Sequence, residues 1–93
     1  YLKTHNQFIG NLTTLEQIDH VMYDRFGKNN VEYLACTLLK DDTGTPTGIL
    51  GFTWEKENEV GYEDSTIKEN LIRYGAIIEQ YIKPNIINNA KIK

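Results

Sequence analysis

The stretch from Val31 to Pro84 decides the fold, because it holds two strand-like segments, a polar turn and a long amphipathic segment in that order. The strand-like segments are VEYLACTLLK, residues 31–40, and GILGFTWEK, residues 48–56, with the turn DDTGTPT between them. Asp, Gly and Pro give this turn its chemistry. The helical segment is STIKENLIRYGAIIEQYIK, and Pro84 is expected to end it. The order predicts a β-hairpin followed by a helix that packs on it.

Apolar residues occupy both faces of the first strand, which is typical of a central strand that is covered on both sides. In the second strand one face is apolar, and Gly51 predicts a β-bulge or a close contact with another element. The apolar sets are Leu34, Cys36 and Leu38 on one face of the first strand, Tyr33, Ala35 and Leu39 on its other face, and Leu50, Phe52 and Trp54 in the second strand.

The segment after the hairpin has the spacing of an amphipathic helix. Gly75 lies within its apolar stripe, and we expect it to allow a close approach to the sheet. Glu63 and Asp64 stand where acids favour the start of a helix. The predicted buried stripe is Ile67, Leu71, Tyr74, Ile78, Tyr81 and Ile82.

The N-terminal part of the chain predicts a lead-in and a helix. Residues 1–12 are mostly polar, and we interpret them as an extended lead-in, with an edge strand as the alternative. Residues 13–27 predict one short helix, with Thr13 as its N-cap and Glu16 completing a capping box. Gly27 stands where a left-handed C′ residue ends a helix. The core residues predicted for this helix are Leu15, Ile18, Met22 and Phe26.

Length and composition indicate one small domain or a piece of one. The chain has 93 residues, a net charge of −3 and 40% hydrophobic residues, which is an ordinary globular composition. Its scattered basic residues argue against a nucleic-acid partner. No run reaches the length of a membrane span, although a chain that begins at Tyr1 leaves room for an upstream anchor. The predicted division is 1–12 lead-in, 13–27 helix, 31–56 hairpin, 64–83 helix and 85–93 tail.

Residues with catalytic or ligand chemistry are sparse. The single cysteine, Cys36, lies in an apolar strand and is expected to be a buried small hydrophobe. His20 has Glu16 and Asp24 four residues away on either side, a spacing that more often gives a solvated charge ladder than a metal site. Asn11 begins a glycosylation triplet. We predict no catalytic residue, no metal ligand and no cofactor.

An aromatic group is the remaining feature with binding character. Its members fall on and around the expected layer between sheet and helix, where they form either a core with amphipathic rims or the lining of a ligand cavity or partner surface. The candidate interaction or pocket residues are Tyr33, Phe52, Trp54, Tyr62 and Tyr74.

The segment LACTLLKDDTGTPTGILGFTWEKENEVGYEDSTIKENLIRYGAIIEQYI resembles the last two strands and final helix of a GAF-type domain. In that family a strand leads into a glycine-punctuated turn, here with Asp42, Gly44 and Gly48, and a loop then leads to a helix start, here Tyr62-Glu63-Asp64. The resemblance covers residues 31 to 83. It implies a GAF/PAS-like second half.

Within that group the segment is similar to the soluble C-terminal domain of T-even-type phage holins, in which Tyr33, Cys36, Gly48 and Trp54 fill the matching places. This likeness implies a non-enzymatic regulatory domain of a phage protein that faces the periplasm, with a membrane segment upstream. The first strands and helix of a full GAF domain are missing or reduced here, so the resemblance assigns no ligand-binding residue.

The expected fold is therefore α+β, a small antiparallel sheet with a short N-terminal helix and a long C-terminal helix packed on it. The leading function hypothesis is a non-enzymatic regulatory or protein-interaction domain that binds a protein partner or itself through a strand edge or the terminal helix. The alternatives are a small-molecule sensor with a pocket between sheet and helices, and a structural component of a virion or other assembly.

Overall fold

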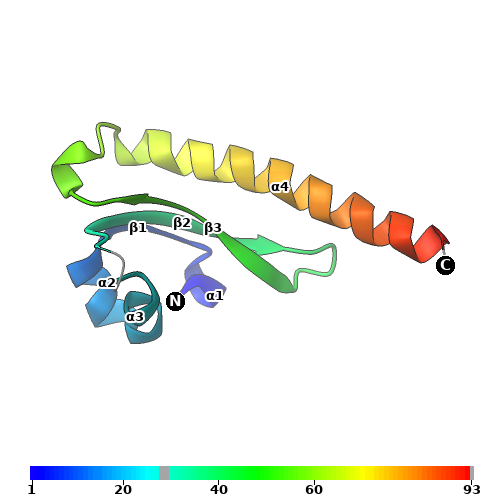
Figure 1. Ribbon diagram of the computed structural model, residues 1–93, viewed down its shortest axis with the longest axis horizontal. Coiled ribbons are helices and arrows are strands. Elements are labelled where there is room, and N and C mark those ends of the chain that lie inside the picture. Colours follow the sequence, from blue (N-terminus) through cyan, green and yellow to red (C-terminus); the bar gives the residue numbers. More distant parts are fainter. Residues whose placement is uncertain (28–29, 93) are drawn as a thin grey trace.

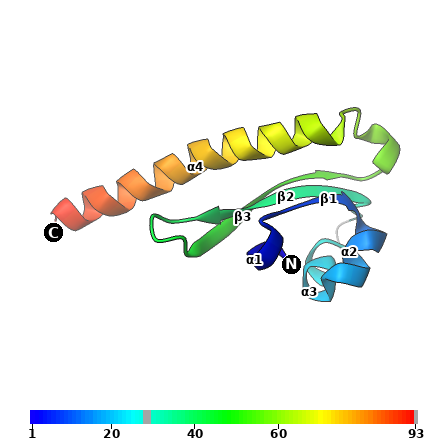
Figure 2. The same ribbon diagram turned by 180° about the vertical axis from the view of Figure 1, so that it is seen from behind.

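The computed structural model describes residues 1–27 and 30–92, with residues 82–92 described by their backbone alone. The elements in chain order are α1 Leu2–His5, β1 Gln7–Asn11, α2 Leu12–Ile18, α3 His20–Phe26, β2 Tyr33–Lys40, β3 Pro46–Trp54, the 3-10 helix η2 Glu57–Glu59 and α4 Asp64–Ile92. The strands form one antiparallel sheet in the order β1-β2-β3, with α4 on one face and α1 to α3 on the other (Figure 1). The view from behind shows the same layers (Figure 2). The predicted α+β class with a small antiparallel sheet is confirmed.

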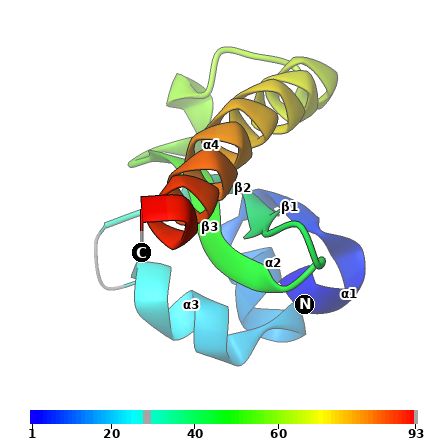
Figure 3. The same cartoon turned by 90° about the vertical axis from the view of Figure 1, so that its right-hand side faces the viewer.

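β2 is the central strand, as its two apolar faces predicted. On one face Leu34 and Cys36 pack with Leu15 in a core beneath α1 to α3. On the other face Ala35 packs with Leu71 in a second core under α4. The end-on view separates these two layers, with α4 above the sheet and the three short helices below it (Figure 3).

The single helix predicted over residues 13–27 is wrong, because the structure has two short helices there. Asp19 lies between α2 and α3 in a non-helical conformation, with φ −152° and ψ 89°. Its Oδ1 accepts the backbone N–H of Met22 at 3.0 Å, so Asp19 is the N-cap of α3. A capping aspartate favours the start of a new helix over continuation of the old one. The break leaves Ile18, a predicted core residue, exposed.

Both predicted ends of this helical region also differ from the structure. The N-cap of α2 is Asn11, whose Oδ1 accepts the N–H of Thr14 at 2.9 Å. The capping box predicted between Thr13 and Glu16 is therefore wrong. Gly27 has φ −63°, so it is right-handed and not the left-handed residue that we predicted.

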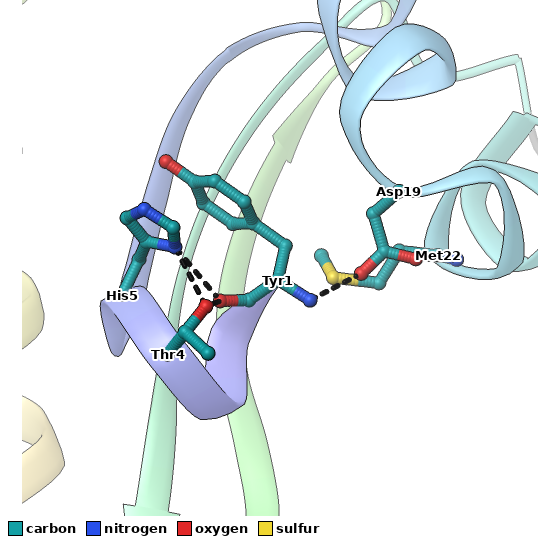
Figure 4. Close-up of polar contacts among 5 residues, drawn as sticks. All are labelled: Tyr1, Thr4, His5, Asp19 and Met22. Carbon is teal, nitrogen blue, oxygen red and sulfur yellow. Dashed lines mark hydrogen bonds and ion pairs between the residues drawn. The ribbon is translucent and has the colours of Figure 1, made fainter.

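The lead-in predicted over residues 1–12 contains both a helical turn and the edge strand. The edge-strand alternative is correct for β1, which pairs with β2, whereas α1 was not predicted. Leu2 anchors α1 because its side chain is buried in the core beneath the sheet. The amino nitrogen of Tyr1 lies 2.9 Å from Oδ2 of Asp19, so α1 is held against the start of α3 (Figure 4).

β2 and β3 form the predicted hairpin. Its turn is shaped by the carboxylate of Asp41, which accepts two backbone N–H groups of the turn. Leu39 pairs with Gly48 and Lys40 with Pro46, so Thr47 is the extra residue of a bulge near the start of β3, and the bulge is not at Gly51 as predicted. Gly51 lies opposite Cys36 in the regular part of the ladder and is exposed.

α4 is longer than predicted, because it continues through Pro84 to Ile92. The helix predicted over 64–83 therefore does not end at Pro84, and the backbone of residues 85–92 is helical where a tail was predicted. A proline within a helix removes one N–H donor and costs about 3 kcal/mol, which weakens a long helix without ending it. α4 consequently extends past the sheet (Figure 1).

Gly75 brings α4 close to the sheet, as the sequence predicted. A Cβ built on Gly75 would lie 3.4 Å from Cγ2 of Thr37 and 3.6 Å from Cδ2 of Leu39. Both distances are ordinary van der Waals contacts, so the backbone of α4 lies about one methyl group above β2.

The buried stripe of α4 is rotated relative to the prediction. Ile67, Leu71 and Gly75 are buried at intervals of four residues, whereas Tyr74 and Tyr81, which we expected in the stripe, are exposed. The reason is Gly75, because α4 comes closest to the sheet where it lacks a side chain. Tyr74, the preceding residue, is therefore turned to the side of the helix.

Candidate interaction surface

The five candidate aromatic residues divide into an inner and an outer set. Tyr33 is buried, and its hydroxyl donates to Oδ1 of Asp64 at 3.0 Å, which ties the start of α4 to β2. Burial and the nearby carboxylate of Asp64 raise the pKa of the Tyr33 phenol. Trp54 meets Tyr33 edge to face, with ring centroids 5.8 Å apart. Phe52 and Trp54 are half-buried against the core under α4. These three residues are part of the sheet–helix layer.

The outer set is Tyr62 and Tyr74, whose side chains are 66% and 47% exposed. The structure therefore does not bring the five residues together. A ligand cavity lined by Phe52, Trp54 and Tyr74 was the feature expected of a sensor. The three cavities described below are lined by other residues.

An exposed apolar strip lies on the flank of α4. It consists of Tyr74, Ile77 and Tyr81, which are 47%, 43% and 71% exposed. Their spacing of three and four residues places them on one side of the helix. We call this set the α4 strip. Ile77 was not among the predicted residues, because it is one position away from the periodic stripe that the sequence suggested.

The α4 strip overhangs β3 rather than β1. Glu79 marks the opposite flank, because its Oε2 accepts the backbone N–H of Lys40 at 2.6 Å. The N–H of Leu38 points to the β1 side, where it donates to the carbonyl of Asn6 at 2.8 Å, and Lys40 shares that direction by the alternation of an antiparallel strand. At 3.6 residues per turn, the strip residues lie roughly 140 to 200° around the helix from Glu79. The strip therefore faces the side of β3.

β3 is an edge strand with one unpaired side. Because β2 presents its odd-numbered backbone groups to β3, the registered residues Gly48, Leu50 and Phe52 bond inward, and their neighbours point outward. The segment PTGILGFTW contains no charged residue. Natural edge strands are usually protected by charges, prolines or bulges, and β3 has Pro46 and the bulge at Thr47 near its start and none of these from Gly48 to Trp54. In the regular part of the strand the outward-pointing residues are Ile49, Gly51 and Thr53, and all three are exposed.

The surface of the described residues includes three cavities of note. The first, of about 450 Å³, is lined by residues of α2, α3 and the loops beside them, including Tyr23, Glu32, Glu55 and Glu57. The second, about 260 Å³, lies between α1, α3 and the hairpin, and the third, about 240 Å³, lies between β2 and the Glu79 flank of α4. In the first cavity the carboxylate of Glu32 already accepts the N–H of Glu57. None of the three coincides with the α4 strip.

The remaining residues with chemical potential have structural partners. Burial raises the pKa of the Cys36 thiol to about 11, so it is protonated at neutral pH. His5 stacks on Tyr1 and its Nδ1 lies 2.8 Å from the hydroxyl of Thr4 (Figure 4). Asn11, the first residue of the glycosylation triplet, caps α2. Among the described residues, no group of three or more His, Cys, Asp or Glu side chains gathers to hold a metal.

Comparison of the chain with protein-family models, with curated proteins and with solved structures finds no match. Within the described part of the chain, no helix combines the length and apolar character needed to cross a bilayer. The functional argument therefore rests on the chain's own surface, which pairs an uncharged strand edge with the α4 strip beside it.

Proposed function

We propose that this chain is a non-enzymatic protein-interaction or regulatory domain whose working surface is the free edge of β3 together with the α4 strip. The observation that carries the proposal is their adjacency. An unpaired edge supplies backbone hydrogen-bonding groups for a partner strand, and the apolar strip beside it supplies area that is favourable to bury.

The finer proposal is the GAF/PAS-like, holin-related identity suggested by residues 31 to 83. It adds a regulatory role in a phage lysis protein, with the domain in the periplasm and an anchor upstream. The order of hairpin, loop and long helix supports it.

A small-molecule sensor is the second candidate, and the cavity of about 450 Å³ near Tyr23 favours it. Three acidic side chains line that cavity, so a ligand with cationic groups would suit it best. Such a ligand should raise the melting temperature at fixed protein concentration. A structural role in an assembly is the third candidate, and it would use the same β3 and α4 surface as the leading proposal.

The test is site-specific photo-crosslinking in cells that produce the full chain. A photoreactive amino acid at Thr53 or at Tyr81 should form protein adducts, because these positions belong to the proposed surface. The control position is Val21, which is 70% exposed on the opposite face. Adducts from the surface positions and not from the control position support the proposal. Equal yields from all three, or none from Thr53 and Tyr81, would contradict it.

A further inference from the structure

When two copies of β3 are placed antiparallel along their free edges, the side chains of one strand nearly complement those of the other. In the regular part of β3, GILGF over residues 48–52, each glycine is as far from Leu50 as a large residue on the other side. Antiparallel pairing of two copies centred on Leu50 would place Leu50 opposite Leu50, Ile49 opposite Gly51 and Gly48 opposite Phe52.

From this register we infer that the partner at the β3 edge is a second copy of the chain, paired antiparallel with Leu50 beside a two-fold axis. The inference rests on the proposed interaction function and names its partner. The result is a continuous six-stranded sheet in the order β1-β2-β3-β3-β2-β1.

Backbone hydrogen bonding is compatible with this register. With Leu50 at the centre, the outward-pointing groups of Ile49 in each copy meet those of Gly51 in the other, which gives two hydrogen-bonded pairs in the regular part of the strand. The N–H and C=O groups of an edge are the main source of affinity in strand addition, and the side chains decide between registers.

The side chains favour the same register. Each glycine of β3 lies opposite a large apolar residue, so Phe52 covers the space above Gly48 and Ile49 covers the space above Gly51. A glycine opposite an aromatic residue is a recognised means of stabilising a strand pair. A partner strand of unrelated sequence would lack this correspondence.

The α4 strip adds contact area at the same axis. Thr37, which is the registered partner of Leu50, lies under Gly75 of α4, so Tyr74 is close to the axis. In the six-stranded sheet the two β2 strands are three strand spacings apart, roughly 14 Å. A helix with its side chains is about 10–12 Å wide, so the two α4 helices would face each other across the axis with a gap of roughly 2–4 Å. Pairing of β3 would thus cover the edge and bring the two strips to face each other.

The first experiment is sedimentation equilibrium of the full chain from about 1 μM to about 1 mM, a range that covers weak and moderate affinities. We expect a monomer–dimer equilibrium. The double variant I49K/G51K places two introduced lysines opposite each other at both Ile49–Gly51 pairs, and it should weaken dimerisation about tenfold or more. The matched variant I49K/G51E makes those pairs oppositely charged and should restore it. Ile49 is 40% exposed, and a Cβ on Gly51 meets nothing closer than 3.5 Å, so both variants should fold.

The second experiment reads the register directly. Two Leu50 residues would lie about 4.5 Å apart between Cα atoms, within disulfide range. L50C should therefore form a covalent dimer on mild oxidation. T53C is the control, since two Thr53 residues would be six positions out of register, roughly 20 Å apart, although Thr53 is the more exposed side chain. Native Cys36 is fully buried and does not compete.

Three results would each overturn the inference. The first is a monomeric mass over the whole concentration range, and the second is equal dimerisation of I49K/G51K and I49K/G51E. The third is that T53C forms a disulfide-linked dimer as readily as L50C. A monomer that still forms photo-adducts with another protein from Thr53 would refute self-pairing and leave the interaction function standing. Absence of adducts from both surface positions would refute the two together.

Discussion

Gly75 offers the sharpest test of how α4 packs on the sheet. The change Gly75→Ala places a methyl group 3.4 Å from Cγ2 of Thr37 and 3.6 Å from Cδ2 of Leu39, which are ordinary contact distances. Alanine is also favoured over glycine in a helix by about 1 kcal/mol. We therefore expect Gly75→Ala to stabilise the protein by about 1 kcal/mol, a rise in melting temperature of roughly 4–8 °C for a domain of this size. Urea unfolding followed by circular dichroism, at fixed low protein concentration, measures it.

Two further variants give this prediction its controls. Ala76→Gly changes the next residue, which is exposed, and should cost about 1 kcal/mol from helix propensity alone. Gly75→Leu has no room for its additional atoms above β2 and should destabilise by roughly 1–3 kcal/mol. If Gly75→Ala were destabilising while Ala76→Gly behaved as expected, the approach of α4 would be closer than described. If Gly75→Leu were tolerated as well as Gly75→Ala, α4 would not be in contact with β2 at this point, and the reasoning would fail.

Three other predictions concern single polar or titratable groups. Tyr33→Phe removes the hydrogen bond to Asp64 and should lower the free energy of unfolding by about 1 kcal/mol. The control Tyr62→Phe, at an exposed site, should leave the free energy of unfolding unchanged. Equal effects of the two variants in urea unfolding would show that the Tyr33–Asp64 hydrogen bond does not stabilise the fold. A backbone N–H of α3 and the amino group of the first residue hold the pKa of Asp19 below its usual 3.8. This carboxylate therefore contributes stability above pH 3.8 that is lost as the pH falls through the folded-state pKa, and Asp19→Asn, which keeps a capping side chain, should show a smaller acid loss in pH-dependent unfolding. Burial raises the pKa of Cys36 from 9.0 to about 11, so the stability contributed by the neutral thiol is complete below pH 9.0 and is lost as the pH rises towards 11. Cys36→Ala should therefore lose less stability at alkaline pH. Parallel curves of stability against pH for the two proteins would show that Cys36 does not cause this loss.

The central layer of the fold could be predicted because its signals are periodic. Apolar residues at both odd and even positions of residues 31–40 indicated a strand covered on both faces, and β2 is the central strand between two cores. The turn and the start of α4 followed from Asp, Gly and Pro chemistry and from acids near Asp64. Such signals are local, so they do not depend on which other segments lie nearby.

The errors came from single side chains that compete with a periodic pattern. Asp19 interrupts a helix that the apolar spacing predicted as continuous, because its carboxylate caps a new helix. Gly75 rotates α4, and so Tyr74 and Tyr81 are exposed although their spacing fits the buried stripe. Neither effect is visible in hydrophobic periodicity, since both depend on geometry.

The candidate surface was only partly predictable for a related reason. The correspondence of glycines and large residues in PTGILGFTW is present in the sequence, but it has no consequence if β3 is an interior strand. Pairing of β1 with β2 decides that β3 is at the edge, and β1 comes from a polar segment with weak strand signals. Only after the topology is known does the spacing around Leu50 become an argument about a partner.

An uncharged, nine-residue edge strand is a hazard for any protein, because it can pair with the edges of unrelated strands. The opposite edge, β1, is short and lies between α1 and α2, whereas β3 has a proline and a bulge only near its start and is unprotected from Gly48 onward. Selection could have protected β3 with a single lysine at exposed positions such as Ile49 or Gly51, neither of which is needed for the core. An isoleucine and a glycine at those positions leave a monomer open to unwanted strand pairing, but they suit a strand whose edge is covered by a partner. The self-complementary spacing around Leu50 favours one cover, because a second β3 in this register places a large residue opposite each glycine.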